Sequence, residues 1–226
     1  MTTTAERVSA VRDRIAATCR RCGRDPAGVR LIGAVKGRAP SDVMALIAAG
    51  VTELGGNYVQ ETHAQRAALG AAGDGVRWHL IGHLQRNKAK AALAGFHVIH
   101  TIDSPALAMT LHDQLSGACR RDPLDVLIEV NIAGEAAKSG IAPDAAPALV
   151  EAVRRLPGLR LLGFMTMAPV AQRAEEARPH FRRLRALRDA IDPALTELSM
   201  GMTDDFEAAI EEGATMVRIG RALFEG

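Results

Sequence analysis

The chain has 226 residues, of which 48% are hydrophobic, which is enough for one sizeable core. A formal net charge of +2, with scattered basic residues and an aromatic content of 3%, argues against nucleic-acid binding, which needs a basic surface and rings that stack on bases. No apolar run is long enough to span a bilayer, and the first six residues do not have the layout of a signal peptide, so we expect a cytoplasmic protein that binds neither nucleic acid nor membranes.

The first predicted element is a helix that carries two of the three cysteines. Thr3 can cap it, Glu6 stands where a capping box needs an acidic side chain, and Gly23 ends it. Cys19 and Cys22 have C-x-x-C spacing, but no second Cys or His pair lies at metal-ligand spacing. We therefore predict that both cysteines occupy apolar helix positions and that the chain has no metal site.

A regular alternation of strands and helices follows. Eight apolar runs predict strands, each with turn residues after it, at 31–35, 51–54, 76–81, 97–102, 125–130, 160–165, 196–199 and 215–218. Helical spacing between them predicts helices from about 41 to 49, 58 to 69, up to 93, from 105, up to 156, 172 to 191 and 204 to 212. In the fourth of these connections, Ser104 is a predicted cap and Pro105 a predicted first helical residue.

Eight strands joined by helices match a closed (β/α)8 barrel and exceed most doubly wound sheets. Because the sequence ends soon after the last strand, the N-terminal helix is expected to take the eighth helical place outside the barrel. With no linker, low-complexity segment or second domain in view, we predict a single α/β TIM-barrel domain over residues 1–226. No glycine-rich nucleotide-binding motif follows the first strand, which weighs against dinucleotides and nucleoside triphosphates.

The chemistry of such a barrel lies at the carboxyl ends of its strands. The first strand ends in Lys36, which is the leading functional candidate, although most strand-end lysines only extend to solvent. The other strand ends carry mainly neutral polar groups and one guanidinium: Asn57, Gly82 with His83, Asp103, Asn131, Met165 with Thr166, the segment 199–203, and Arg218 with Gly220.

Two of these strand ends have the composition of a phosphate site. Ser199, Met200, Gly201 and Thr203 lie in a short loop before the predicted helix at 204, where backbone N–H groups meet a positive helix end. Gly220 would let a second backbone segment approach a ligand closely. The alternative is that the two hydroxyl residues only cap the helix.

A lysine beside a phosphate site indicates a phosphorylated aldehyde or ketone. Lys36 at the end of an apolar strand can lose its proton through desolvation and then attack a carbonyl carbon. Pyridoxal 5′-phosphate (PLP) and a sugar phosphate bound as in Schiff-base aldolases both fit. Arg218 favours PLP, because a permanently charged guanidinium facing the pyridine nitrogen keeps that nitrogen unprotonated and the ring a weak electron sink.

Motifs over nearly the whole chain are found at 34–36, 55–61, 78–82 with 84–88, 138–140, 163–166, 198–206 and 216–220. Together they resemble the YggS/PROSC family of pyridoxal-phosphate homeostasis proteins. The resemblance implies a barrel like the N-terminal domain of alanine racemase, which is fold type III among PLP proteins. It implies that Lys36 holds PLP as a Schiff base, that Arg218 faces the pyridine nitrogen, and that Asn57 lies beside the ring. Ser199, Gly220 and the neighbouring backbone would hold the phosphate.

The sequence departs from the family pattern around the expected cofactor. Val35 and Gly37 flank the lysine where the family usually has small hydroxyl residues, and Gly56 replaces a usual Glu. His83 stands where Pro is common, and Arg221 where Ser or Thr is common. These differences leave the lysine and the arginine in place but change the hydrogen bonding expected near PLP.

The expected function is therefore a monomeric PLP carrier or regulator in intracellular vitamin B6 and amino-acid homeostasis, with recipient apo-enzymes as its partners. Related racemases complete their sites with a second domain and a tyrosine acid/base, which this chain does not supply, so no catalytic residue and no enzyme activity are predicted. The enzyme alternative is a PLP-dependent racemase of low activity. A Schiff-base aldolase is the third hypothesis.

Overall fold

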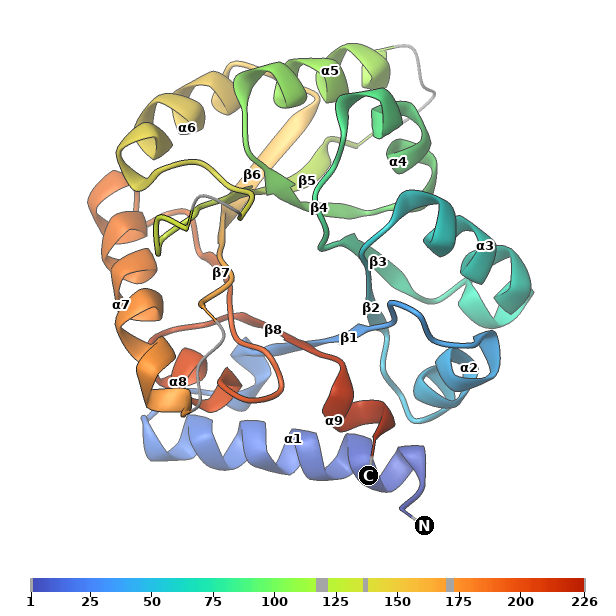
Figure 1. The fold of residues 1–226 in the computed structure, drawn as a ribbon. Helices are drawn as coiled ribbons and strands as arrows, with labels where there is room; N and C mark the ends of the chain where they lie inside the picture. Colours follow the sequence, from blue (N-terminus) through green and yellow to red (C-terminus); the bar gives the residue numbers. More distant parts are fainter. Residues whose placement is uncertain (1, 117–121, 136–137, 170–172, 226) are drawn as a thin grey trace.

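We describe the chain from a computed structural model that defines residues 2–116, 122–135, 138–169 and 173–225. Eight parallel strands follow one another in sequence order and close into a barrel, with helices around the outside (Figure 1). The predicted (β/α)8 architecture is confirmed. The strands are β1 (Arg30–Ala34), β2 (Glu53–Gly56), β3 (Arg77–Leu80), β4 (Val98–Ile102), β5 (Leu124–Glu129), β6 (Leu159–Met165), β7 (Glu197–Ser199) and β8 (Met216–Ile219).

The helices of the described residues alternate with these strands. They are α1 (Thr4–Arg21), α2 (Pro40–Ala48), α3 (Val59–Leu69), α4 (Ala89–Gly95), α5 (Pro105–Ser116), α6 (Ala146–Arg154), α7 (Ala174–Ile191), α8 (Phe206–Glu211) and α9 (Arg221–Phe224). Short 3-10 turns lie at Pro26–Gly28, Gly70–Gly73, Arg86–Lys88 and Pro143–Ala145. The predicted start of the seventh helix at residue 172 lies outside the described residues.

The N-terminal helix α1 closes the ring of helices. Its capping box is formed as predicted, with Thr3 Oγ1 accepting from the Glu6 N–H at 3.2 Å and Glu6 Oε2 accepting from the Thr3 N–H at 2.7 Å. Gly23, at a φ of +69°, follows the end of the helix. Figure 1 shows α1 crossing below β8 and β1, packed on α2, α8 and α9, so the prediction that it takes the eighth helical place is confirmed.

The cysteine prediction holds for one residue of the pair. Cys19 is fully buried in the face of α1 that packs on the barrel, whereas Cys22 is the exposed residue that ends the helix. The helical spacing was right, but the apolar stripe stops one turn before Cys22. Among the residues that the structure describes, no group of His, Cys, Asp or Glu is arranged to hold a metal ion.

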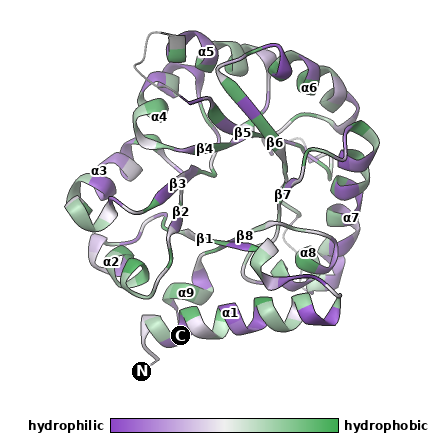
Figure 2. Ribbon diagram, turned by 180° about the vertical axis from the view of Figure 1, so that it is seen from behind, coloured by the Kyte–Doolittle hydropathy of each residue, from purple (hydrophilic) through white to green (hydrophobic). Residues whose placement is uncertain are grey.

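The hydrophobic core lies between the barrel and its helices. Every residue of β4 and β5 is buried, as expected of parallel strands covered on both faces. Figure 2 shows hydrophilic and hydrophobic residues alternating along the outer helices, which is typical of helices with one face on a barrel. None of the helices in the described ranges is both long and apolar enough to cross a membrane.

Candidate functional site

A cavity of about 330 Å³ opens at the carboxyl ends of β1, β7 and β8. Three of the predicted ligand-binding residues line it, namely Thr203, Arg218 and Gly220, together with Ala34, Met202, Asp204, Asp205 and Arg221 and two residues at the start of α7, Arg173 and Ala174. Active sites of TIM barrels lie at this end of the fold. The cavity therefore coincides with the phosphate site expected after strands seven and eight.

Arg218 is the charged group at the bottom of this cavity. Its side chain is only 4% exposed, and its guanidinium donates from Nη1 to Ser199 Oγ at 2.7 Å and from Nη2 to the Thr166 carbonyl oxygen at 2.9 Å. Burial lowers the pKa of Arg218 to about 10, so it stays positively charged at neutral pH. Because a guanidinium has five N–H donors, these two contacts leave others for a ligand.

The loop after β7 is shaped by Gly201. This residue has a φ of +94°, and a Cβ there would lie 2.6 Å from Ala209 Cβ and 2.9 Å from Phe206 Cα, so only glycine fits. Its carbonyl oxygen accepts from the Arg218 N–H at 3.0 Å, which joins the loop to β8. Met200, just before it, is fully buried. Met200 and Gly201 thus set the path of the loop more than they offer side chains to a ligand.

The helix after this loop differs from the prediction. It begins at Phe206 and not at 204, and it is only six residues long, so the positive helix end expected to attract a phosphate is weak. Asp205 Oδ1 accepts from the Met202 N–H at 2.6 Å, which leaves that donor unavailable to a ligand. The alternative that Ser199 and Thr203 cap the helix is also wrong, because Ser199 Oγ points into the barrel toward Arg218 and Thr203 Oγ1 accepts from the Ala222 N–H at 3.5 Å.

The remaining lining of the cavity suits an anion. A Cβ at Gly220 would lie 3.7 Å from Ala34, an ordinary contact distance, so nothing crowds the backbone of Gly220. Arg173 and Arg221 add positive charge, although each forms an ion pair, Arg173 with Glu176 and Arg221 with Asp204. Burial raises the pKa of Asp205 above its ordinary value. The described residues therefore fit a phosphate near Thr203 and Gly220, with Arg218 beside whatever ring the phosphate carries.

Lys36 lies on a turn just after β1 and not on the strand itself. The Arg38 N–H donates to the Val35 carbonyl oxygen at 3.1 Å, and Gly37 has a φ of +68°, which explains a glycine at the third position of this turn. The lysine is exposed, and its Nζ lies 5.3 Å from the centroid of the Tyr58 ring. The burial expected at the end of an apolar strand is wrong for this side chain, and Lys36 lines neither the phosphate cavity nor the cavity beside Asn57 described below.

Helix α3 holds the lysine turn in place. Gln65 is 6% exposed, and its Nε2 donates to the carbonyl oxygens of Val35 at 2.9 Å and Arg38 at 3.0 Å. Glu61 Oε1 accepts from the Gly37 N–H at 2.5 Å. One buried amide thus satisfies both ends of the turn that presents Lys36.

Replacing Gln65 by leucine should leave the Arg38 carbonyl oxygen without its side-chain donor and the Val35 carbonyl oxygen with the Arg38 N–H alone. We expect the free energy of unfolding to fall by about 2 kcal/mol, because a buried polar group that loses its partner costs its desolvation energy. Urea denaturation measures the change, and Gln114→Leu, an exposed glutamine on α5, is the matched control that should be nearly neutral. Equal stability of the Gln65 variant and the wild type would show that the turn does not depend on α3.

Asn57 borders a second cavity of about 440 Å³, which also contains Tyr58, Gly82, His83 and Lys88. The backbone is tightly packed here, because a Cβ at Gly82 would lie 2.3 Å from the Asn57 carbonyl oxygen. Asn57 and Lys36 therefore follow neighbouring strands at the same end of the barrel, as predicted, but Asn57 is not a lining residue of the phosphate cavity.

The departures from the family pattern have physical accounts. A Cβ at Gly56 would lie 1.9 Å from Thr62 Oγ1, so a larger residue there requires Thr62 to move. Val35 is fully buried. His83 is half-exposed, and its Nδ1 lies 3.2 Å from Asp103 Oδ2, which follows the neighbouring strand β4.

Two buried polar side chains near the site were missed in the sequence. Glu129, the last residue of β5, is 3% exposed, and its Oε2 has no hydrogen-bond partner among the described residues. Its pKa is raised to about 7, mainly by burial and also by the charge of Asp103, while Arg218 opposes the shift. His100 in β4 is fully buried, and its Nδ1 lies 2.9 Å from Ser199 Oγ. Both residues interrupt apolar strands, which is the signal that could have revealed them.

Comparisons with known proteins agree with this geometry. The family described as alanine racemase, N-terminal domain, matches residues 7–226. A protein of Pseudomonas aeruginosa described as a pyridoxal phosphate homeostasis protein is 44% identical over 99% of this chain and 96% of its own length, and one of Aquifex aeolicus with the same description is 41% identical over 97% and 96%. The structure of PipY from Synechococcus elongatus PCC7942 with PLP bound is similar with a TM-score of 0.84 and 30% identity, covering 98% of this chain and 100% of that chain.

Proposed function

Because this chain belongs to the alanine racemase N-terminal domain family and, within it, to the pyridoxal phosphate homeostasis proteins, we propose that it binds PLP and acts in intracellular PLP and amino-acid homeostasis. PipY, a relative with the same barrel, has been solved with PLP bound. The proposal extends to residues 1–226 as one PLP-binding domain that works as a cytoplasmic monomer and gives its cofactor to apo-enzymes.

We assign the binding of PLP to residues at the carboxyl ends of four strands. Lys36 supplies the amine that joins the aldehyde as a Schiff base, and Asn57 lies beside the ring. Thr203 and Gly220 hold the phosphate, while Met200 and Gly201 fix the path of the loop that carries Thr203. Ser199 acts through Arg218, because its Oγ accepts a hydrogen bond from the guanidinium, and not as the direct phosphate ligand that the sequence predicted.

The observation that carries the proposal is the buried, charged Arg218 in the lining of a cavity whose residues suit an anion. When bound, PLP supplies an electrophilic carbon and an electron-withdrawing pyridine ring. Arg218 cannot give up a proton at neutral pH, so it holds the ring nitrogen as a hydrogen-bond acceptor and leaves the ring a weak electron sink. A carrier is thereby favoured over an enzyme.

The test is to add PLP to the purified protein and to record the visible spectrum before and after borohydride reduction. We expect the absorbance band of a Schiff base, one pyridoxyl group per chain after reduction, and delivery of PLP to an apo-enzyme in a coupled assay. The absence of both the band and the reduced adduct would refute the proposal. An adduct that carries a sugar would favour the aldolase. Exchange of an amino acid's α-proton for deuterium would favour the racemase.

A further inference from the structure

A line of polar side chains, all buried except the partly exposed Glu53, crosses the interior of the barrel and ends at Arg218. It begins at Glu53 in β2, where Oε2 lies 2.9 Å from His79 Nε2 of β3. His79 Nδ1 lies 2.9 Å from His100 Nε2 of β4, and His100 Nδ1 lies 2.9 Å from Ser199 Oγ of β7. Ser199 Oγ in turn accepts from Arg218 Nη1 at 2.7 Å. Side chains of five strands thus form one connected line, which we call the polar line.

Both histidines of the polar line are neutral. His79 and His100 are fully buried, and burial lowers the pKa of each below its ordinary value. A neutral imidazole has one N–H donor and one acceptor nitrogen, so each ring can pass a hydrogen bond along in one direction only.

The Glu53 end of the polar line fixes that direction, and the Arg218 end is compatible with it. Arg218 only donates, so Ser199 Oγ accepts from it and is free to donate its O–H to His100 Nδ1. His100 then carries its proton on Nε2 and donates to His79 Nδ1. His79 carries its proton on Nε2, which faces the Glu53 carboxylate, a group that only accepts when ionised. This arrangement of protons makes hydrogen bonds of all three interior links, while His79 Nε2 lies 2.9 Å from Glu53 Oε2 without a well-aligned bond.

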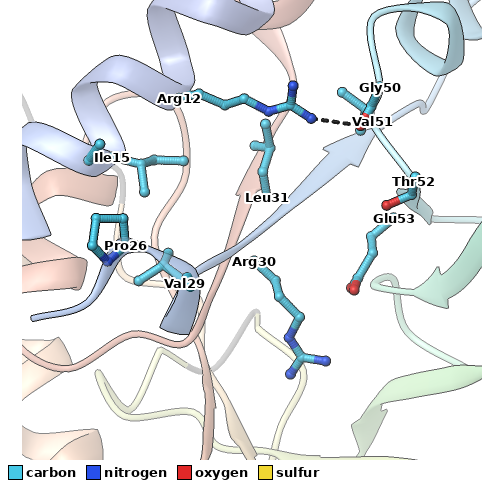
Figure 3. Close-up of a pocket in the computed structure, with 12 residues that line it drawn as sticks. Arg12, Ile15, Pro26, Val29, Arg30, Leu31, Gly50, Val51, Thr52 and Glu53 are labelled. Carbon is cyan, nitrogen blue, oxygen red and sulfur yellow. Dashed lines mark hydrogen bonds between the residues drawn. The ribbon is translucent and has the colours of Figure 1, made fainter.

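The Glu53 end of the polar line reaches a pocket at the opposite end of the barrel from the cofactor cavity. This pocket, of about 450 Å³, lies between α1, β1 and β2 and includes Glu53 and Arg30, which Figure 3 shows on neighbouring strands. The link between Glu53 Oε2 and His79 Nε2 is short but poorly aligned for a hydrogen bond, whereas the interior links are well-aligned hydrogen bonds. The weakest link of the polar line is therefore the one beside this pocket.

We propose that Glu53, His79, His100 and Ser199 form a positioning relay for Arg218, in which the carboxylate at the amino end of the barrel sets the hydrogen-bond direction that presents the guanidinium to the cofactor cavity. None of the first three residues lines that cavity, so each acts through Ser199 and Arg218. The proposal rests on the assignment of PLP to this cavity only for its effect on affinity. The proton arrangement itself does not depend on any ligand.

The first arm of the test is nitrogen-15 NMR of the histidine rings in the protein without PLP, with the signals assigned from His79→Gln and His100→Gln. Both rings should be neutral and protonated on Nε2. In Glu53→Gln, the new amide can donate as well as accept, so the direction is no longer fixed and a second tautomer should appear in both rings. A charged imidazole or protonation on Nδ1 in the wild type would overturn the relay.

The second arm measures PLP affinity. Glu53→Gln should weaken binding roughly fivefold, which corresponds to about one hydrogen bond. Glu197→Gln is the matched control, because Glu197 lies at the same end of the barrel and its side chain is 21% exposed, against 18% for Glu53. Glu197 contacts Arg30 and Thr215, which are not part of the polar line. Equal affinity of Glu53→Gln and Glu197→Gln would show that Glu53 does not act on Arg218. Absence of PLP binding by the wild type would instead refute the proposed function, and the tautomers would still decide the relay.

Discussion

Replacing Lys36 by alanine is expected to abolish the Schiff-base absorbance of the protein with PLP completely. The amine is the only group of this side chain that can join an aldehyde covalently, and methylene or methyl groups cannot replace it. The remaining phosphate and ring contacts still permit weak, non-covalent binding. Because Lys36 is exposed and its amine lies over the Tyr58 ring, the loss to the free energy of unfolding should not exceed about 1 kcal/mol.

The lysine count makes this experiment easy to interpret. The chain has four lysines, at 36, 88, 90 and 138, so peptide mapping after borohydride reduction distinguishes them without ambiguity. Lys36→Arg keeps the positive charge but has no primary amine, and it should behave like the alanine variant. Lys88→Ala is the matched control, because Lys88 borders the cavity beside Asn57 and its loss should leave the absorbance unchanged. A pyridoxyl group on Lys88 or Lys138 in the wild type would contradict the assignment to Lys36.

The order of elements could be predicted from the sequence because the strands of this barrel are short, buried and separated by turn residues. The capping box at Thr3 and the stop at Gly23 were predicted correctly for the same reason, since both depend on residues within one turn of each other. The start of α8 was predicted two residues too early. Asp204 and Asp205 both resemble helix starts, and the bond from Met202 to Asp205 selects the later one.

The side chains of the site were harder to predict, because their contacts join distant strands. Lys36, Arg218 and Gly220 could be proposed from their places at strand ends, but the direction of the Ser199 hydroxyl depends on His100, 99 positions earlier in the chain. No local pattern contains that information. In the same way, the exposure of Lys36 follows from a tight turn that α3 holds through Gln65, 30 positions away from Val35. Sequence spacing therefore located the site but did not determine its hydrogen bonds.

Replacing Glu129 by glutamine is expected to change how the stability of the protein depends on pH. Burial raises the pKa of Glu129 from 4.5 to about 7, so the folded state binds a proton more tightly than the unfolded state does. Between these two values the folded protein carries more protons, and the free energy of unfolding falls as the pH rises. Above pH 7 the wild type has lost about 3 kcal/mol through this one group, relative to pH values below 4.5.

Glutamine has nearly the same shape as the protonated acid but cannot ionise. Glu129→Gln should therefore match the wild type below pH 4.5 and exceed its free energy of unfolding by about 3 kcal/mol above pH 7. Urea denaturation at a series of pH values gives both curves, and their difference removes the contributions of all other titrating groups. Glu151→Gln, an exposed carboxylate on α6 with 61% side-chain exposure, should give a curve parallel to that of the wild type. A difference between wild type and Glu129→Gln that stays constant with pH would mean that Glu129 ionises as an exposed carboxyl does, and that Arg218 faces a full negative charge at neutral pH.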